Sequence, residues 1–130
     1  MISTQDKLEP KGELAIRTVA MPADTNPSGN IFGGWIVSQM DLAGGEICKK
    51  LSCANVVTVA IQAMEFIEPV HVGDFVCCYV DLIKTGTTSM TVHVETWALS
   101  PRKSERRKVT EGVFIYVSVD DEHKPTPIQR

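Results

Sequence analysis

The sequence predicts an α+β domain in which a curled, antiparallel sheet of five strands wraps around one long central helix. One stretch, residues 31–52, carries a helical period, whereas five other stretches carry the alternation or the β-branched residues typical of strands. No helical stretch separates the last four strands, and this order is typical of an α+β fold with a largely antiparallel sheet.

The chain has the size and composition of a single domain. Its 130 residues, of which 43% are hydrophobic and 22% charged, allow one core but leave no room for a second. We expect the domain to span residues 1–130, with a core at about 12–119 and flexible tails at 1–11 and 120–130. The tails are polar, and the second contains two prolines.

The first strand is predicted at residues 13–21, where the side chains alternate weakly, and it stops at Pro22. Residues 22–30 are almost all turn formers, so they should form an ordered loop of the kind that often carries function.

The helix is predicted from an apolar stripe whose members follow one another at steps of three or four: Ile36, Met40, Ala43, Ile47 and Leu51. Further apolar residues lie off this stripe, so protein should enclose most of the helix. Gly44 and Gly45 each cost about 1 kcal/mol relative to alanine. A neighbouring group must therefore come close to the helix backbone there.

Four further strands are predicted at residues 56–66, 75–84, 90–99 and 109–119. Residues 85–89 form a hairpin, and residues 100–108 form a basic loop. A helix that is apolar nearly all round has one suitable location, inside the concave side of the sheet, which is the architecture called hotdog. One helix flank and one sheet edge would stay exposed, so we expect pairing into a dimer.

The charge balance argues against several classes of partner. A net charge of −3 and an isoelectric point near 5.6 give no general reason to bind nucleic acid or an anionic membrane. We find no secretory signal and no apolar run of the roughly 20 residues that a membrane span needs, so we expect a cytoplasmic protein. The four cysteines show neither C-x-x-C nor zinc spacing, which predicts reduced, structural thiols and no metal site.

Asp41 is the first candidate for chemistry. On a helix it lies about 100° from Met40 and about 120° or more from Ile36 and Ile47, so its carboxylate leaves the apolar stripe on a side lined by small residues. In a partly dry site such a carboxylate is useful as a base or nucleophile. The alternative is a solvated residue, or one that packs against a polar neighbour.

Two glycines and an asparagine precede Asp41 and could complete a site. Gly33 and Gly34 lie at the predicted start of the helix, where N–H groups lack internal acceptors and can polarise a carbonyl. Asn26 offers an amide that could orient water or substrate. The alternatives are a tight loop-to-helix junction for the glycines and an Asx turn for Asn26.

Other hydrolytic machinery is missing from the sequence. There is no G-x-S-x-G motif, and His71, His93 and His123 lie in no metal-ligand spacing, which argues against serine-triad and zinc hydrolysis.

Residues 102–108 of this acidic chain contain five cationic side chains. They form either a solvated loop or a clamp for a phosphorylated ligand, which residues 84–89 could also contact.

Three motifs, taken in order, resemble one known family. Residues 21–26 read MPADTN, residues 29–35 read GNIFGGW and residues 38–41 read SQMD. With similar segments at residues 57–59, 69–70, 72–74, 76–79 and 84–89, they resemble the bacterial YciA-type acyl-CoA thioesterases of the hotdog superfamily over about residues 12–119.

This resemblance implies hydrolysis of acyl-CoA to free CoA and a carboxylic acid, in fatty acid metabolism, with no cofactor besides the CoA of substrate and product. The catalytic aspartate and asparagine fall on Asp41 and Asn26, which would serve one site from different protomers. Family dimers commonly assemble into hexamers, so we expect a trimer of dimers. The predicted substrate- or CoA-binding residues are Thr58, Val59, Lys84, Gly86, Thr87, Thr88, Ser89, Arg106 and Arg107.

The sequence leaves the mechanism and the acyl chain length open. Asp41 either activates water or attacks directly to form an anhydride. Two rival functions also stay open: a non-enzymatic CoA or acyl-CoA-binding protein, and a CoA-dependent hydratase, which would need a histidine that the loop-helix segment lacks. A nucleic-acid module is less favoured, because no aromatic residue lies within the basic loop.

Overall fold

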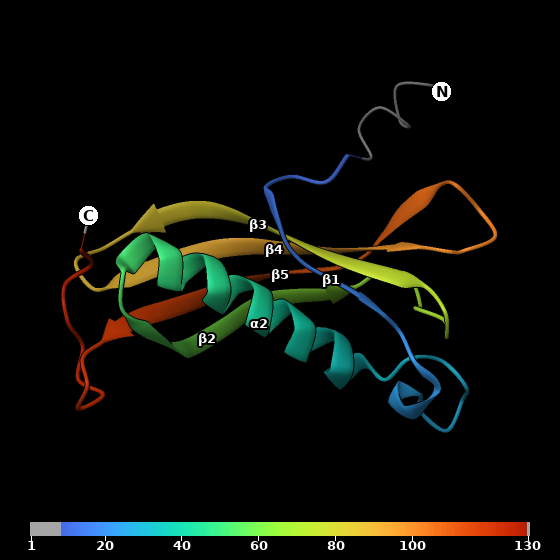
Figure 1. The fold of residues 1–130 in the computed structure, drawn as a ribbon, viewed down its shortest axis with the longest axis horizontal. Coiled ribbons are helices and arrows are strands. Elements are labelled where there is room, and N and C mark those ends of the chain that lie inside the picture. Colours follow the sequence, from blue (N-terminus) through green and yellow to red (C-terminus); the bar gives the residue numbers. More distant parts are fainter. Residues whose placement is uncertain (1–8, 130) are drawn as a thin grey trace.

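The computed structural model describes residues 9–129. The elements are β1 (Glu13–Val19), the 3-10 helix η1 (Pro22–Asp24), α2 (Gly33–Ser52), β2 (Asn55–Phe66), β3 (Phe75–Thr85), β4 (Ser89–Leu99) and β5 (Arg106–Val119). The strands form one antiparallel sheet in the order β1-β3-β4-β5-β2, and α2 lies across one face of it (Figure 1). The predicted α+β fold, one long helix on a five-stranded sheet, is confirmed.

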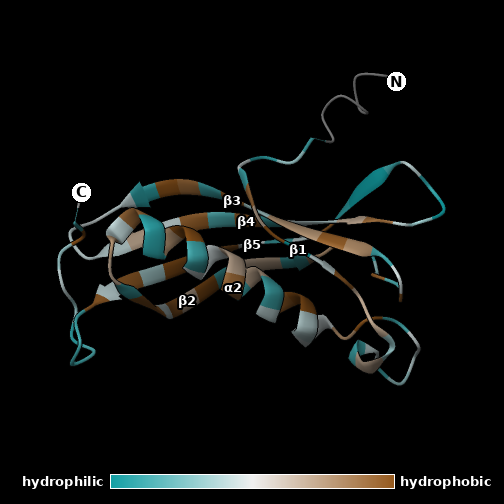
Figure 2. Cartoon of the chain, in the orientation of Figure 1, coloured by the Kyte–Doolittle hydropathy of each residue, from teal (hydrophilic) through white to brown (hydrophobic). Residues whose placement is uncertain are grey.

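The apolar stripe of α2 packs against the inner face of the sheet. Four of its predicted members are at most 7% exposed: Ile36, Met40, Ala43 and Ile47. They share one core with inward-facing residues of the three central strands, among them Val76, Val80, Met90, Val92, Val94 and Phe114. Figure 2 shows α2 banded in hydrophobic and hydrophilic colours, as is typical of a helix buried on one side. One chain therefore does not enclose most of the helix as predicted, and Leu42, which lies off the stripe, is 61% exposed. Leu51, at the helix end, is 40% exposed.

Strand β5 begins three residues earlier than predicted. Arg106, Arg107 and Lys108 pair with the last residues of β4, so these cations stand on a strand and not in a loop. Ladder hydrogen bonds do not depend on side-chain polarity, and long cationic side chains can lie along an outer sheet surface. The apolar pattern alone therefore placed the start of β5 too late.

The C-terminal segment is more regular than its composition suggests. The N–H groups of Thr126 and Ile128 donate to the carbonyls of Ser118 and Thr87, both at 2.9 Å. These bonds fold residues 120–129 back against the end of the sheet (red in Figure 1). The frayed tail expected from the two prolines is thus hydrogen-bonded as far as residue 129.

Strand β2 forms one edge of the sheet and carries exposed apolar side chains. Val57, Val59 and Ile61 are 37%, 54% and 43% exposed, and Val59 sits where the register shifts between Thr58 and Ala60. An open edge of this kind is suited to pairing with another strand.

Among the described residues, no helix has the length and apolar character needed to cross a membrane.

Candidate active site

Asp41 lies in the middle of α2 and is tied to the two strands at the β2 side of the sheet. Its Oδ1 atom accepts hydrogen bonds from the Thr58 hydroxyl at 2.7 Å and from the Tyr116 hydroxyl at 2.9 Å. Thr58 and Tyr116 are partners in the β2–β5 ladder, so the two hydroxyls come from adjacent positions. Within residues 9–129, Oδ2 has no hydrogen-bond partner, and this oxygen is free to meet a ligand.

Tyr116 reaches Asp41 because Gly44 leaves room for its ring. The side chain is 1% exposed, and a Cβ at position 44 would lie 2.5 Å from the hydroxyl oxygen. Burial, and then the adjacent Asp41 carboxylate, raise the pKa of the Tyr116 phenol, so the hydroxyl keeps its proton and can donate at neutral pH. The group predicted to approach the helix at its two glycines is therefore Tyr116.

The N-terminal end of α2 presents unpaired donors. Its cap residue, Phe32, makes no side-chain capping bond, and the first turn carries no acidic residue. The N–H groups of Gly33 and Gly34 find no acceptor among the described residues. Such a helix end favours a developing negative charge on a bound oxygen.

Asn26 organises the loop that leads into the helix. Its Oδ1 accepts from the N–H groups of Ser28 at 2.9 Å and Asn30 at 3.1 Å, and its own N–H donates to the Asn30 carbonyl at 2.7 Å. The turn predicted as the structural alternative is therefore present. The side-chain NH₂ group has no acceptor in the described part of the chain, so it is still available to a ligand.

An apolar groove of about 240 Å³ opens beside the start of α2, lined by Ile31, Gly33, Ile36, Phe66, Ile67, Glu68, Pro69 and Val70. The Phe66 ring is 55% exposed and would contact a Cβ on Gly33 at 3.5 Å. A slender apolar group bound in the groove would thus lie next to the unpaired helix donors.

One chain does not bring Asp41 together with Gly33. Asp41 lies eight positions after Gly33 on α2, so their Cα atoms are about 12 Å apart along the helix axis. A single reacting carbonyl must lie about 3 Å from both the donors and the carboxylate. The candidate residues therefore form two half-sites, one around Asp41 and one at residues 26–34.

Comparison with known proteins identifies the family. Residues 28–105 match the family model described as the thioesterase superfamily. The chain belongs to the thioesterase superfamily.

Other members of the superfamily match nearly the whole chain. The acyl-CoA thioester hydrolase YciA of Salmonella typhimurium is 50% identical over 122 residues, which cover 92% of each protein. The hexameric thioesterase y2039 from Yersinia pestis is 49% identical, with a TM-score of 0.90, over 94% of this chain and 100% of that one. HI0827, a hexameric broad specificity acyl-coenzyme A thioesterase crystallised as a mutant, is 46% identical, with a TM-score of 0.89, over 92% and 88%. The resemblance drawn from residues 21–41 is confirmed.

The predicted CoA-binding residues of this thioesterase-superfamily chain fall in separate places. Thr58 contacts Asp41, and Val59 is exposed on β2. Lys84 lies near the end of β3, Gly86, Thr87 and Thr88 form the turn that follows, and Ser89 begins β4. Arg106 and Arg107 pair with the other end of β4. The 11 residues of β4 span about 33 Å. One chain therefore cannot direct both sets at the same phosphate group.

The two predicted arginines already have partners in the protein. Arg107 contacts Asp74 at 3.0 Å and Glu68 at 3.2 Å, and Arg106 contacts Glu9 at 2.8 Å. Asp74 is 3% exposed, so its pairing with Arg107 is part of the structure. A phosphate contact by either arginine stays a prediction, and it would have to replace or share these carboxylates.

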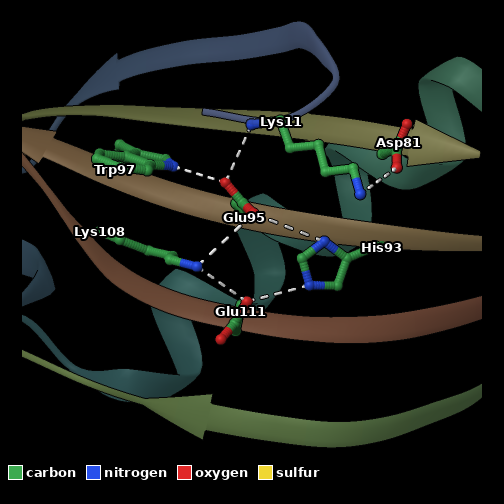
Figure 3. A network of polar contacts seen from close by, with 7 residues as sticks. All are labelled: Lys11, Asp81, His93, Glu95, Trp97, Lys108 and Glu111. Carbon is green, nitrogen blue, oxygen red and sulfur yellow. Dashed lines mark hydrogen bonds and ion pairs between the residues drawn. The ribbon is translucent and has the colours of Figure 1, made fainter. Parts of the chain in front are cut away.

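A second polar cluster lies on the face of the sheet opposite α2 (Figure 3). His93, Glu95 and Glu111 offer donor atoms within 4.8 Å of one another, as a metal site would require. However, the Lys108 ammonium lies 3.2 Å from Glu111 and 3.7 Å from Glu95, in the position that a cation would need. Trp97 also donates to Glu95 at 2.9 Å. We interpret this cluster as an ion-pair network that holds β4 and β5 together.

Sequence reasoning missed Tyr116, the second donor to Asp41. The two residues are 75 positions apart, so no local pattern links them. Two signals were nevertheless present: the unexplained glycines of the helix, and a tyrosine at an inward-facing position of a core strand. A buried tyrosine hydroxyl needs a polar partner, and the helix backbone at Gly44 was the place predicted to receive a close neighbour.

Proposed function

We propose that this thioesterase-superfamily chain hydrolyses acyl-CoA to free CoA and a carboxylic acid. The proposal depends above all on the Asp41 carboxylate, which has one oxygen held by Thr58 and Tyr116 and the other unpaired. An acyl-CoA thioester hydrolase that is 50% identical over 92% of the chain supports the same reaction.

The reaction would use the two half-sites together. The oxygen of the thioester carbonyl accepts hydrogen bonds from the N–H groups of Gly33 or Gly34, and these bonds stabilise the negative charge that develops on it. Water adds to the carbonyl carbon after giving a proton to Asp41, or Asp41 adds first and water then cleaves the anhydride. In both routes the C–S bond breaks, and the CoA sulfur takes up a proton.

A second copy of the chain would complete each site. The distance along α2 prevents one chain from placing Gly33 and Asp41 on one carbonyl. The open edge of β2, with Val57, Val59 and Ile61 exposed, is a surface on which another copy could pair. The hexameric relatives are consistent with dimers of this kind gathered into a trimer. Asn26 would then reach the Asp41 of a neighbouring protomer.

The surroundings of the helix start suit an acyl-CoA molecule. The groove beside Gly33 is lined mainly by apolar side chains and could hold the acyl chain. A wider cavity of about 740 Å³ lies between residues 68–74 and 100–107 and includes Arg102 and Lys103. Their side chains have no partner among the described residues, so they could contact phosphate alongside Arg106 and Arg107.

The positions of the histidines weaken the hydratase alternative. His93 lies in the ion-pair network on the far side of the sheet, His71 lies in the segment before β3 and His123 lies after β5. Asp41 takes its hydrogen bonds from hydroxyl groups. The His and Asp pair that hydration would require is not formed around Asp41.

Replacing Asp41 by asparagine tests the function. CoA release from esters ranging from acetyl to palmitoyl is measured with a thiol reagent, and the same series gives the chain-length preference. We expect Asp41→Asn to lower kcat by about 10²–10⁴-fold, as for the loss of a catalytic base. Asp81→Asn, on the outer face of β3, is the control and should turn over normally. A folded Asp41→Asn protein with near-normal turnover would refute the proposal.

A further inference from the structure

We propose that Tyr116 is a positioning residue for Asp41. Together with Thr58, Tyr116 holds Oδ1 of Asp41, so Oδ2 is the oxygen of Asp41 that reacts. The inference rests on the proposed function of Asp41. It identifies the oxygen that takes the proton from water or forms the anhydride.

The geometry restricts Asp41 at two points. The Tyr116 hydroxyl lies 2.9 Å from Oδ1 and also 2.9 Å from the Asp41 backbone carbonyl oxygen. A hydroxyl shared between these two oxygens links the carboxylate to its own backbone and limits rotation of the side chain. Thr58 then approaches Oδ1 from the neighbouring strand at 2.7 Å.

This restriction makes the two carboxylate oxygens unequal. A freely rotating carboxylate presents either oxygen to a substrate, whereas Oδ1 of Asp41 is occupied by two donors before any substrate binds. A group held in its productive geometry loses less freedom in the transition state. The Oδ2 atom, which has no partner within residues 9–129, is the one left to react.

The setting of Tyr116 indicates that its hydroxyl is retained for this contact. The neighbouring inward-facing residue of β5, Phe114, is fully buried without any hydroxyl, and its ring stacks with that of Tyr116 at 6.3 Å. A phenylalanine could therefore fill the same layer. Gly44 provides the space that the hydroxyl needs, at the expense of helix propensity.

The test compares Tyr116→Phe with Tyr79→Phe, since Tyr79 on the outer face of β3 is the only other tyrosine in the chain. We expect Tyr116→Phe to lower kcat by about ten- to a hundredfold, the usual effect of losing one hydrogen bond to a charged group. KM should stay within about twofold, because the hydroxyl acts through Asp41 and not on the substrate. Tyr79→Phe should leave both kcat and KM unchanged.

The outcomes separate this inference from the proposed function. If Asp41→Asn is inactive while Tyr116→Phe has the kcat of the unaltered protein, the positioning role is wrong and the function stands. If Asp41→Asn remains active, the function itself is wrong. Gly44→Ala gives a second route, because its Cβ would displace the Tyr116 hydroxyl, and it should lower kcat with little change in KM. Unchanged kcat in a folded Gly44→Ala protein would also overturn the inference.

Discussion

The phenolic oxygen of Tyr116 lies over the backbone of Gly44 so closely that a Cβ at position 44 would stand 2.5 Å from it. Tyr116 is 1% exposed and stacked on Phe114, so its ring has little room to move away. The helix and the last strand are therefore fitted to each other at the residue that holds Asp41.

Replacing Gly44 by alanine should destabilise the protein by about 1–3 kcal/mol, the usual result of overpacking a core. Helix propensity alone would predict about 1 kcal/mol of stabilisation, so the sign of the change identifies the steric effect. Gly45→Ala is the matched control, because its Cβ would meet the Tyr116 ring at an ordinary 3.7 Å. Free energies of unfolding from denaturant titration should fall for position 44 only. Equal effects at both positions would contradict the close fit.

A site shared between protomers should show complementation. Asn26→Ala and Asp41→Ala proteins should each be nearly inactive, because each lacks one half-site. Unfolded together and refolded as a mixture, they should regain about a quarter of the normal activity, since half of the dimers are mixed and each has one intact site of two. Activity that stays at the sum of the two separate variants would place the whole site in one chain.

Arg107 and Arg106 are adjacent in sequence but should differ in their effect on stability. Arg107→Met leaves the buried Asp74 carboxylate without its cation and should cost about 2 kcal/mol of unfolding free energy. Arg106→Met removes an exposed contact with Glu9 and should cost less than about 1 kcal/mol. Thermal and denaturant unfolding of both variants measure this difference. A rise in KM for acyl-CoA, measured on the folded variants, would separately indicate phosphate binding.

The ion-pair network on the outer face should make stability depend on pH. Burial alone would raise the pKa of Glu111, but Lys108 and then His93 outweigh it and lower that pKa below the ordinary 4.5. A lowered pKa in the folded state gives stability that is present above about pH 4.5 and is lost as the pH falls further. The unfolding free energy lost in Lys108→Met should therefore be constant above about pH 5 and should shrink as the pH falls below about 4.5. Lys103→Met, which removes no ion pair in the described structure, should show no such change.

Much of the fold follows from local patterns in the sequence, whereas the pairing of its strands does not. The stripe from Ile36 to Ile47 predicts the buried face of α2, because helix geometry repeats over a few residues. The start of β5 is different: Arg106, Arg107 and Lys108 carry no apolar signal, and their place on the strand depends on β4. A register set by a partner strand cannot be deduced from the strand itself.

The candidate site was likewise predictable in part. Positions on the helix and in the preceding loop were enough to name four candidates: Asp41, Asn26, Gly33 and Gly34. The resemblance to a known family then assigned catalytic roles to Asp41 and Asn26. The resemblance also implied a site shared between protomers, and the rise of α2 between Gly33 and Asp41 gives a physical reason for two half-sites. The role of Tyr116 could not be predicted, because it depends on a strand 75 residues away that passes over Gly44.

The order of the strands has a consequence for synthesis of the protein. Strand β2 follows the helix directly, but its ladder partner is β5, the last strand of the chain. A growing chain can therefore complete α2 long before Thr58 and Tyr116 are able to meet at Asp41. Pairing over such a sequence separation is slow compared with helix formation. During refolding, we expect helical signal to return first and turnover to return only with closure of the β2–β5 ladder.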